Sequence, residues 1–244
     1  MRNKIGVAQI RAALNAEDIP HVSVDVQPFV PDMPVVQQEG PLICWGPSFV
    51  PRVLEHADIN PGIWYDHDTF RWSVFQNRWG SQMLNQSAEV MPFDVACEQL
   101  SNTPQFLRPD ANNKAFEGGV FDANSKPKLQ PNFDPKIPTV VAPPTKVTDE
   151  WRFFVVNGQI ADASSYRVSG QPNQDGFVPA DAVDLVFKAI ESWTPAPVVC
   201  IDVGFDGQRF GIVEANCFNA SRLYGANPQK IVFAVTEFVR KDFA

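Results

Sequence analysis

Residues 201–216 read IDVGFDGQRFGIVEAN, in which two largely apolar runs carrying acidic residues flank a turn-like stretch. Successive side chains of a strand face opposite sides of a sheet, and this pattern predicts a β-hairpin. A two-residue turn at Asp206 and Gly207 would place Asp202 and Glu214 on opposite faces. A connection of odd length, or a bulge centred near Gln208, would instead place Asp202 opposite Glu214.

If that second register holds, the hairpin gathers Asp202, Glu214 and Asn216 on one face. These side chains offer only hard oxygen ligands, which suit Mg²⁺ bound together with substrate phosphates and do not suit Zn²⁺. Phosphates also need cations, and the chain offers Arg108, Lys114, Arg152 and Arg167 on separate segments. The alternative is a strand that simply runs out into a polar loop. We predict that Asp202 and Glu214 share a face.

A second hairpin is predicted over DEWRFFVVNGQIADASSYR, residues 149–167. Asn157 and Gly158 are typical of a type I′ turn, which would pair Val156 with Gln159. In that register position 152 faces 163, and position 150 faces 165. One face then carries an acid and two arginines, and the other is apolar core. The polar face would hold Glu150, Arg152, Ser165 and Arg167, and the core face Trp151, Phe153 and Val155.

Two helices are predicted from apolar residues at helical spacing, over 181–193 and over the C-terminal stretch NPQKIVFAVTEFVRK. We expect Asp181 to cap the first helix and Asn227 to cap the second, with Pro228 in its first turn. The apolar stripe of the first helix is Val183, Val186, Phe187, Ile190 and Trp193. The order hairpin, helix, hairpin, helix predicts an α+β arrangement with the helices on one side of the sheet.

The earlier part of the chain carries weaker signals. FLRPDANNKAFEGGVF, residues 106–121, predicts a hairpin with a long connection. The four prolines of residues 122–138 favour a surface loop, which could be a bare linker or a mobile lid. Residues 1–95 are rich in tryptophan, which is more typical of packing than of a ligand platform.

Charge and composition restrict the partners and the compartment. The 28 acidic and 20 basic residues give a net charge of −8, which disfavours nucleic acid and anionic membranes as partners. No run of 18 apolar residues and no signal-peptide core occurs, so we expect a soluble, cytoplasmic protein. The four cysteines are scattered and are expected to be reduced. Neither a P-loop nor a Rossmann motif is present.

Several of these motifs together resemble a known superfamily. IDVGFDGQRFGIVEAN resembles the paired metal-binding strands of ATP-grasp enzymes, and DEWRFFVVNGQI resembles their E-x-R strand. FLRPDANNKAFEGG and EANCFNASRLY are similar to the phage and bacterial ATP-grasp group called R2K, for its two arginines and a lysine. The likeness covers about residues 104–241.

The resemblance implies an α+β, ATP-grasp fold in which two lobes clasp ATP, preceded by a small α/β domain. The expected ranges are residues 1–95 for a domain like those that precede ATP-grasp folds, 96–143 for the first lobe with its flexible loops, and 144–244 for the second lobe with the metal site.

It also implies roles around ATP and Mg²⁺. Asp202, Glu214 and Asn216 would bind Mg²⁺, with Glu214 bridging two ions. Arg108 stands where many ATP-grasp enzymes have a phosphate-binding lysine. Lys114, which precedes Gly118 and Gly119, would close over the phosphates as part of a flexible flap. The backbone of Val140, Val141 and Ala142 would bind adenine, and Glu150 would point toward the nucleotide.

The remaining implied roles concern the reaction. Arg152 and Arg167, together with Lys114, would be the catalytic cations, the two arginines acting on the γ-phosphoryl group and the acyl phosphate. Tyr166, Asn219 and Ser221 would face the acceptor substrate.

The activity implied is an ADP-forming ligase that joins a carboxylate to an amine or thiol through an acyl phosphate. Amino acids, peptides, proteins and other small molecules are the candidate substrates, and the sequence is compatible with an oligomer. Two alternatives stay open. One is a nucleotide-binding module whose acceptor pocket docks a partner, and the other is an ATP-dependent kinase of a small molecule.

Overall fold

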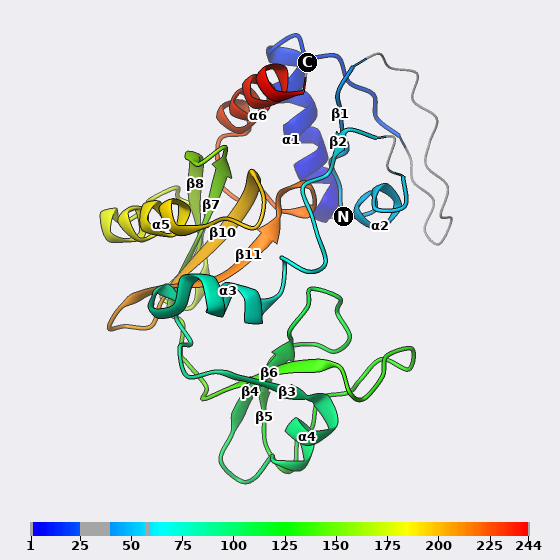
Figure 1. Cartoon of the computed structure of the whole chain (residues 1–244). Helices are drawn as coiled ribbons and strands as arrows, with labels where there is room; N and C mark the ends of the chain where they lie inside the picture. Colours follow the sequence, from blue (N-terminus) through cyan, green and yellow to red (C-terminus); the bar gives the residue numbers. More distant parts are fainter. Residues whose placement is uncertain (1, 25–39, 57–58, 244) are drawn as a thin grey trace.

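The structure, a computed structural model, describes residues 2–24, 40–56 and 59–243 of the chain. Figure 1 shows a large upper part built around one sheet and a small lobe below it. The helices are α1 (Arg2–Ala16), α2 (Val50–Val53), α3 (Trp72–Trp79), α4 (Phe93–Glu98), α5 (Ala180–Ser192) and α6 (Pro228–Asp242), with 3₁₀ turns at Gly80–Gln82 and Phe218–Ala220. No helix in these described ranges is long and apolar enough to cross a membrane.

The small lobe is a four-stranded antiparallel sheet in the order β3-β6-β4-β5, with α4 packed against it. Its strands are β3 (Glu89–Pro92), β4 (Gln105–Pro109), β5 (Gly119–Phe121) and β6 (Pro138–Ala142). The predicted hairpin over residues 106–121 is confirmed as β4 and β5. The connection over residues 122–138 packs Leu129, Phe133 and Ile137 against the core of this lobe, so part of it is not a bare linker.

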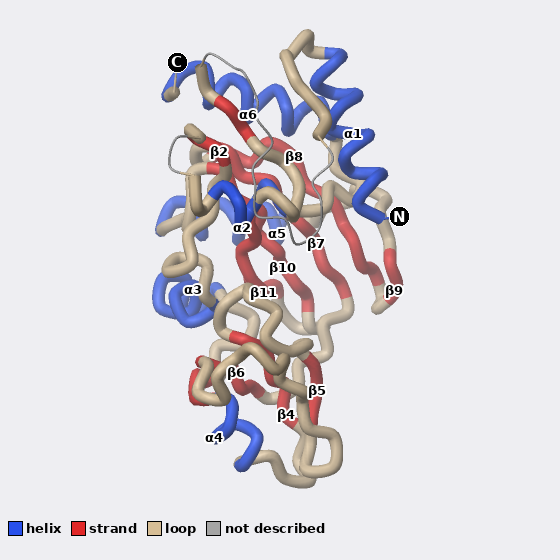
Figure 2. Tube along the Cα trace, turned by 90° about the vertical axis from the view of Figure 1, so that its right-hand side faces the viewer, coloured by secondary structure: helices blue, strands red, loops and turns tan. Residues whose placement is uncertain are grey.

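The large lobe is a five-stranded antiparallel sheet in the order β11-β10-β7-β8-β9, which lies above the small sheet in Figure 2. Its strands are β7 (Asp149–Val156), β8 (Gln159–Val168), β9 (Gln171–Pro172), β10 (Val198–Phe205) and β11 (Phe210–Cys217). A further two-stranded parallel sheet joins β1 (Leu42–Ile43) to β2 (Pro61–Gly62).

The turn between β7 and β8 is confirmed, but the register beyond it is not the predicted one. Asn157 and Gly158 have φ values of 46° and 73°, and Val156 pairs with Gln159, as a type I′ turn requires. Two bulges then follow. Each inserts one extra residue of β8, so that Arg152 lies opposite Ser164 and not 163, and Glu150 lies opposite Arg167 and not 165.

The register of β10 and β11 places Asp202 directly opposite Glu214, which confirms that they share a face. Phe205 pairs with Phe210, so residues 206–209 form a four-residue loop. The extra residue lies between Ile212 and Glu214, not near Gln208. The tight turn at Asp206 and Gly207 therefore does not form.

The helices of the large lobe lie on opposite faces of the sheet, so the prediction of one covered side is wrong. On α5, Ala182 and Val186 pack with Phe153 and other core-face residues. On α6, Ile231 packs with Phe154 and the residues of the reverse face. Because β7 is buried on both faces along most of its length, each face needs its own cover.

The caps and apolar stripes of the two helices match the predictions unevenly. The Asn227 side chain accepts hydrogen bonds from the second and third residues of α6, and Pro228 is its first residue, as predicted. Asp181 lies inside the first turn of α5 and caps nothing, because Pro179 takes the capping position. Phe187 is 42% exposed, so it does not belong to the buried stripe.

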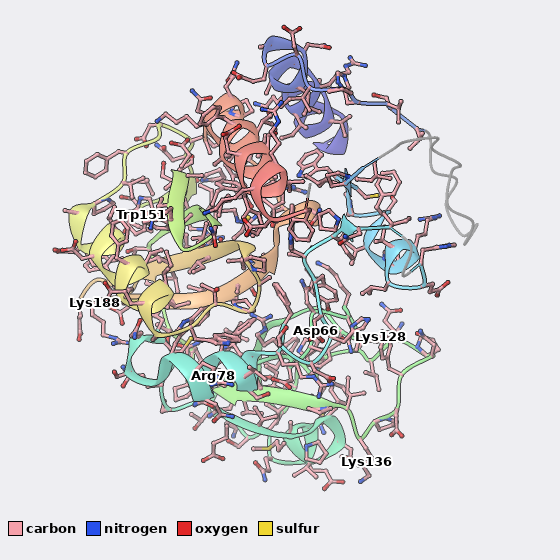
Figure 3. All side chains as sticks on the ribbon, turned by 45° about the horizontal axis from the view of Figure 1, so that its top comes forward. Asp66, Arg78, Lys128, Lys136, Trp151 and Lys188 are labelled. Atoms are coloured by element: carbon pink, nitrogen blue, oxygen red, sulfur yellow. The ribbon has the colours of Figure 1, made fainter. Side chains whose placement is uncertain are left out.

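The described part of residues 1–95 shares its core with the rest of the chain. Helix α1 packs on α6, and α3 packs on α5 (Figure 3, where Arg78 and Lys188 mark α3 and α5). The Trp79 indole donates hydrogen bonds to the Ala189 and Trp193 carbonyls at the end of α5. Strand β3 belongs to the small-lobe sheet, so the domain boundary expected near residue 95 falls inside that lobe. All four cysteines are free thiols, as expected.

Candidate functional site

One face of the large sheet changes from apolar to polar along its strands. Beneath α1 and α6 it carries apolar residues such as Phe154 and Cys200. Arg152 on β7 and Asp202 on β10 lie two residues nearer the small lobe on the same two strands. They lie opposite each other. Side chains two apart share a face, so the covered apolar surface continues directly into a charged cluster.

Arg152 and Asp202 form a buried two-pronged ion pair. The Nε and Nη2 atoms of Arg152 donate to the two carboxylate oxygens of Asp202 at 2.8 and 2.7 Å. Both residues are almost fully buried. Burial raises the pKa of Asp202 although Arg152 opposes this, and the negative charge of Asp202 keeps the pKa of Arg152 well above its usual value despite burial. Charged groups this deep need such a partner.

Glu214 pairs with an arginine from the other lobe. Arg108 lies on β4 of the small lobe, and its Nη1 atom donates to the Glu214 carboxylate at 2.6 Å. Gly118 lies against Arg108, and a Cβ added there would come within 3.1 Å of the Arg108 Cβ. Burial acts to raise the pKa of Glu214, but Arg108 and Asn216 outweigh it, so this pKa is lowered.

Asn216 joins the two carboxylates. Its side-chain amide donates to Asp202 at 3.0 Å and to Glu214 at 2.9 Å. Within the described residues no group of three or more His, Cys, Asp or Glu side chains could hold a metal ion. Two carboxylates and one amide nevertheless fit Mg²⁺, which usually takes one or two carboxylates and fills its other positions with water and phosphate oxygens.

Glu150, Tyr166 and Arg167 form a second group beside this cluster. The Tyr166 hydroxyl donates to Glu150 at 2.9 Å, and the Nε atom of Arg167 lies 2.9 Å from the other Glu150 oxygen. The bulge at Tyr166 is what brings two consecutive side chains of β8 to one carboxylate. Burial raises the pKa of Glu150, and Tyr166 and Arg167 oppose this.

Tyr224 was not foreseen from the sequence. Its ring stacks on Tyr166, with ring centres 4.7 Å apart and planes 17° apart. The guanidinium carbon of Arg152 lies 5.2 Å from the Tyr224 ring centre and 6.0 Å from that of Tyr166. The only signal in the sequence is a tyrosine in the polar loop after β11, and a tyrosine in a loop is too common to identify a site.

The other residues expected around ATP are Lys114, Val140, Val141 and Ala142, which all belong to the small lobe. Lys114 is exposed in the β4–β5 connection and makes no hydrogen bond or ion pair with a described residue. Val140 and Val141 lie on β6, which pairs with β3 on one side and with β4 on the other. Their backbone groups therefore serve the sheet. Ala142 ends β6, where it pairs with Phe106 of β4 alone.

Asn219 and Ser221 are buried, and their side chains form hydrogen bonds within the protein. The Asn219 side chain accepts from the Trp64 backbone N–H at 2.9 Å and donates to the Cys44 carbonyl at 2.8 Å. Ser221 donates to the Cys217 carbonyl at 2.8 Å. Because the polar atoms of both side chains are hydrogen-bonded inside the protein, we assign neither side chain a contact with the acceptor substrate.

Two hollows lie outside the cluster. The larger, of about 540 Å³, lies between the Leu84–Ser87 segment and Pro143 and Thr145 of the connection between the lobes. The smaller, of about 370 Å³, lies between the tip of the β7–β8 hairpin and α6.

Solved structures with a similar fold include two ATP-grasp proteins. A RimK domain protein ATP-grasp from Sphaerobacter thermophilus is 13% identical, with a TM-score of 0.59, over 96% of this chain and 94% of that one. D-alanine–D-alanine ligase from Bacillus anthracis, complexed with ATP, is 15% identical, with a TM-score of 0.50, over 80% of this chain and 75% of that one. These likenesses show the fold alone.

The ATP-grasp ligase PsnB, complexed with a minimal precursor, is 12% identical with a TM-score of 0.48 over 70% of this chain. The match spans 60% of the PsnB chain. No curated protein sequence matches the chain.

Residues 86–234 match the family described as ATP-grasp domain, R2K clade family 2. The match begins just before β3 and ends within α6, so it includes the main sheets of both lobes and every residue of the charged cluster. Because it covers more than half of the 244 residues, the chain belongs to family 2 of the R2K clade of ATP-grasp domains.

Proposed function

We propose that the protein is an ATP- and Mg²⁺-dependent ligase that joins a carboxylate to an amine or thiol. The observation that carries this proposal is the pairing of Asp202 and Glu214 on one face, joined by Asn216 and faced by arginines from both lobes. Two acids beside several cations can hold a metal and the phosphates of a nucleotide at one point between the lobes.

Asp202, Glu214 and Asn216 would hold Mg²⁺. The amide of Asn216, which now donates to both acids, would turn to present its oxygen, since a rotation about the last side-chain bond exchanges the two atoms. Bound Mg²⁺ would neutralise negative charge on the triphosphate. The substitutions Asp202→Asn and Glu214→Gln would each keep one oxygen ligand of this site and remove one negative charge.

The cations would act on the phosphates. The Arg108 side chain already reaches from the small lobe into the cluster. It would leave Glu214 and bind a phosphate oxygen instead. Arg152 and Arg167 would face the γ-phosphoryl group and the acyl phosphate, where their planar forks can share several oxygens. Lys114, which is exposed in the β4–β5 connection, would close over the phosphates only when they are present.

In the reaction, an oxygen of the substrate carboxylate attacks the γ-phosphorus and ADP leaves, which forms an acyl phosphate. The amine nitrogen or thiolate then attacks the carbonyl carbon, inorganic phosphate leaves, and an amine also loses a proton. Tyr166 lies beside this site and would face the acceptor, and Glu150 would point toward the nucleotide. Amino acids and peptides carry both reacting groups, so we propose them as substrates.

Product analysis separates the ligase from the two alternatives. With ATP, Mg²⁺ and pooled amino acids and peptides, we expect ADP, free phosphate and a new amide. Added hydroxylamine should capture the acyl phosphate as a hydroxamate. A kinase would give ADP and a stable phosphate ester without free phosphate. A nucleotide-binding module would show a higher melting temperature with ATP but no ADP.

A further inference from the structure

Tyr224 has a backbone conformation that a tyrosine rarely adopts. Its φ is 54°, in the left-handed region that is energetically costly for residues other than glycine. Gly225 follows it directly and does not itself have a positive φ. A turn alone could have used glycine at position 224 without that cost. A bulky side chain in such a conformation is an outlier of the kind that is often found at functional sites.

The loop that carries Tyr224 is fixed against β8 and the segment that follows β9. The Gly225 backbone N–H donates to the buried Ser164 hydroxyl at 3.0 Å. A Cβ at position 225 would lie 2.7 Å from the carbonyl oxygen of Gln174, so only glycine fits this close approach. The backbone next to Tyr224 is therefore fixed, which limits where its ring can lie.

The contacts of Tyr224 are made by its ring. It stacks on Tyr166 and lies beside the Arg152 guanidinium, whereas its hydroxyl makes no hydrogen bond to a described residue. A cation near an aromatic face is attracted to it, more strongly where water is excluded, as it is around buried Arg152. The guanidinium thus has two kinds of partner, the Asp202 carboxylate and the pair of rings.

These two kinds of partner differ in what happens to them during the proposed reaction. If Asp202 binds Mg²⁺, its oxygens have fewer lone pairs left for Arg152. The rings bind no metal and accept no phosphate, so their contact with Arg152 persists.

We propose that Tyr224 is a positioning residue, whose ring, stacked on Tyr166, holds the Arg152 guanidinium toward the phosphates when Asp202 releases it. This inference rests on the proposed function, in which Asp202 binds the metal and Arg152 faces the transferred group. It adds a residue from the β11–α6 loop to the reaction, and it gives the strained backbone at position 224 a purpose.

The kinetic test compares Tyr224→Phe, which keeps the ring, with Tyr224→Leu, which removes it. Tyr65→Leu is the control, because Tyr65 is also half-buried and packs on aromatic rings, but lies outside the cluster. We expect Tyr224→Leu to lower kcat for ADP release about 3- to 30-fold, the range of one cation–π contact, with KM for ATP within about twofold. Tyr224→Phe and Tyr65→Leu should keep kcat.

A second readout needs no turnover. The Arg152 Nε–H resonance in a nitrogen-resolved NMR spectrum can be assigned by its loss in Arg152→Lys. The nearby rings shift this resonance, so Tyr224→Leu should move it, whereas Tyr224→Phe and Tyr65→Leu should leave it in place.

The kinetic and NMR measurements distinguish failure of the positioning role from failure of the proposed function. Normal kcat in Tyr224→Leu, an equal loss in Tyr224→Phe, or an unmoved Arg152 resonance would each overturn the positioning role. A fall in kcat with a matching rise in KM would also overturn it, because it would indicate general damage to the site. If the wild-type protein releases no ADP, the proposed function fails, and the NMR comparison still decides whether the ring contacts Arg152.

Discussion

Residues of the charged cluster can contribute to folding, to catalysis or to both, and substitutions can distinguish the two contributions. Glu214 lies at the boundary of the lobes, with its side chain 25% exposed, and packs little of the core. Glu214→Gln removes one charge with almost no change of shape. We expect Mg²⁺-dependent turnover to fall roughly 100-fold or more, with the far-ultraviolet circular dichroism spectrum unchanged.

The matched control for this prediction is Glu237→Gln, a change of an exposed carboxylate on α6. It should leave turnover normal. Loss of the folded spectrum in Glu214→Gln would mean that Glu214 is a structural residue.

Arg152 and Arg167 should differ in a way that their sequence positions do not reveal. Arg152→Lys loses one of the two prongs to buried Asp202, so we expect it to lower both kcat and the free energy of unfolding, the latter by about 1–3 kcal/mol. Arg167 is 46% exposed, and Arg167→Lys should lower kcat alone. Both falls in kcat should reach roughly 100-fold.

Urea unfolding and initial rates of ADP release measure the two quantities. Near-normal kcat in both lysine variants would show that the planar guanidinium groups are not needed for the reaction.

At the scale of elements, the β7–β8 turn fixes the hairpin that carries three of the charged residues. Gly158→Ala places a Cβ at a φ of 73° without a steric clash, since its nearest neighbour would be 3.7 Å away. We therefore expect a loss of about 1 kcal/mol in the free energy of unfolding from backbone strain. Gly158→Asn should lose less, because asparagine tolerates this conformation.

Urea denaturation of the two variants checks this prediction. Equal stability of Gly158→Ala and the wild-type protein would mean that the turn is not type I′ in solution.

The elements themselves could be predicted better than their relation to one another. The Asn157–Gly158 turn follows from a local residue pattern, and it is confirmed. The opposition of Asp202 to Glu214 was predicted against the local signal of Asp206 and Gly207, because one metal site needs both acids on one face, and it is also confirmed. The bulge at Tyr166 could not be predicted, because a bulge depends on what the strand packs against and leaves no fixed pattern. The position of α5 and α6 on opposite faces was missed because it depends on how the helices pack on the sheet, which the pattern within each helix does not specify.

At the site, the sequence predicted a shared face but not the partners on it. That Asp202 pairs with Arg152 follows from the order of strands β7 and β10, which residue patterns alone do not specify. The contact of Arg108 with Glu214 depends on how the lobes pack, and that of Tyr224 with Arg152 on a strained loop. These contacts join residues far apart in sequence.

At the scale of the whole molecule, Asn219 links the N-terminal segment to the end of β11. It accepts from the Trp64 backbone and donates to the Cys44 carbonyl, and all three residues are buried. We expect Asn219→Ala to lower the free energy of unfolding by about 2–4 kcal/mol, because it leaves buried backbone groups unpaired. Limited proteolysis should then cut residues 40–64 more readily.

The same variant tests whether Asn219 touches the acceptor. Because its side chain is engaged inside the protein, kcat per folded molecule should stay within about twofold of the wild-type value. A rise in KM for the acceptor without loss of stability would restore a substrate-binding role to Asn219.

Arg108 of the small lobe meets Glu214 of the large lobe in the charged cluster, and we propose that the acyl phosphate forms there. The most direct measurement uses amino acids and peptides whose carboxylates carry oxygen-18. Phosphorus NMR of the inorganic phosphate released with ATP and Mg²⁺ should show one labelled oxygen per phosphate, since the carboxylate oxygen that attacks the γ-phosphorus leaves with it. Phosphate without the label, or ADP formed without free phosphate, would contradict the ligase mechanism.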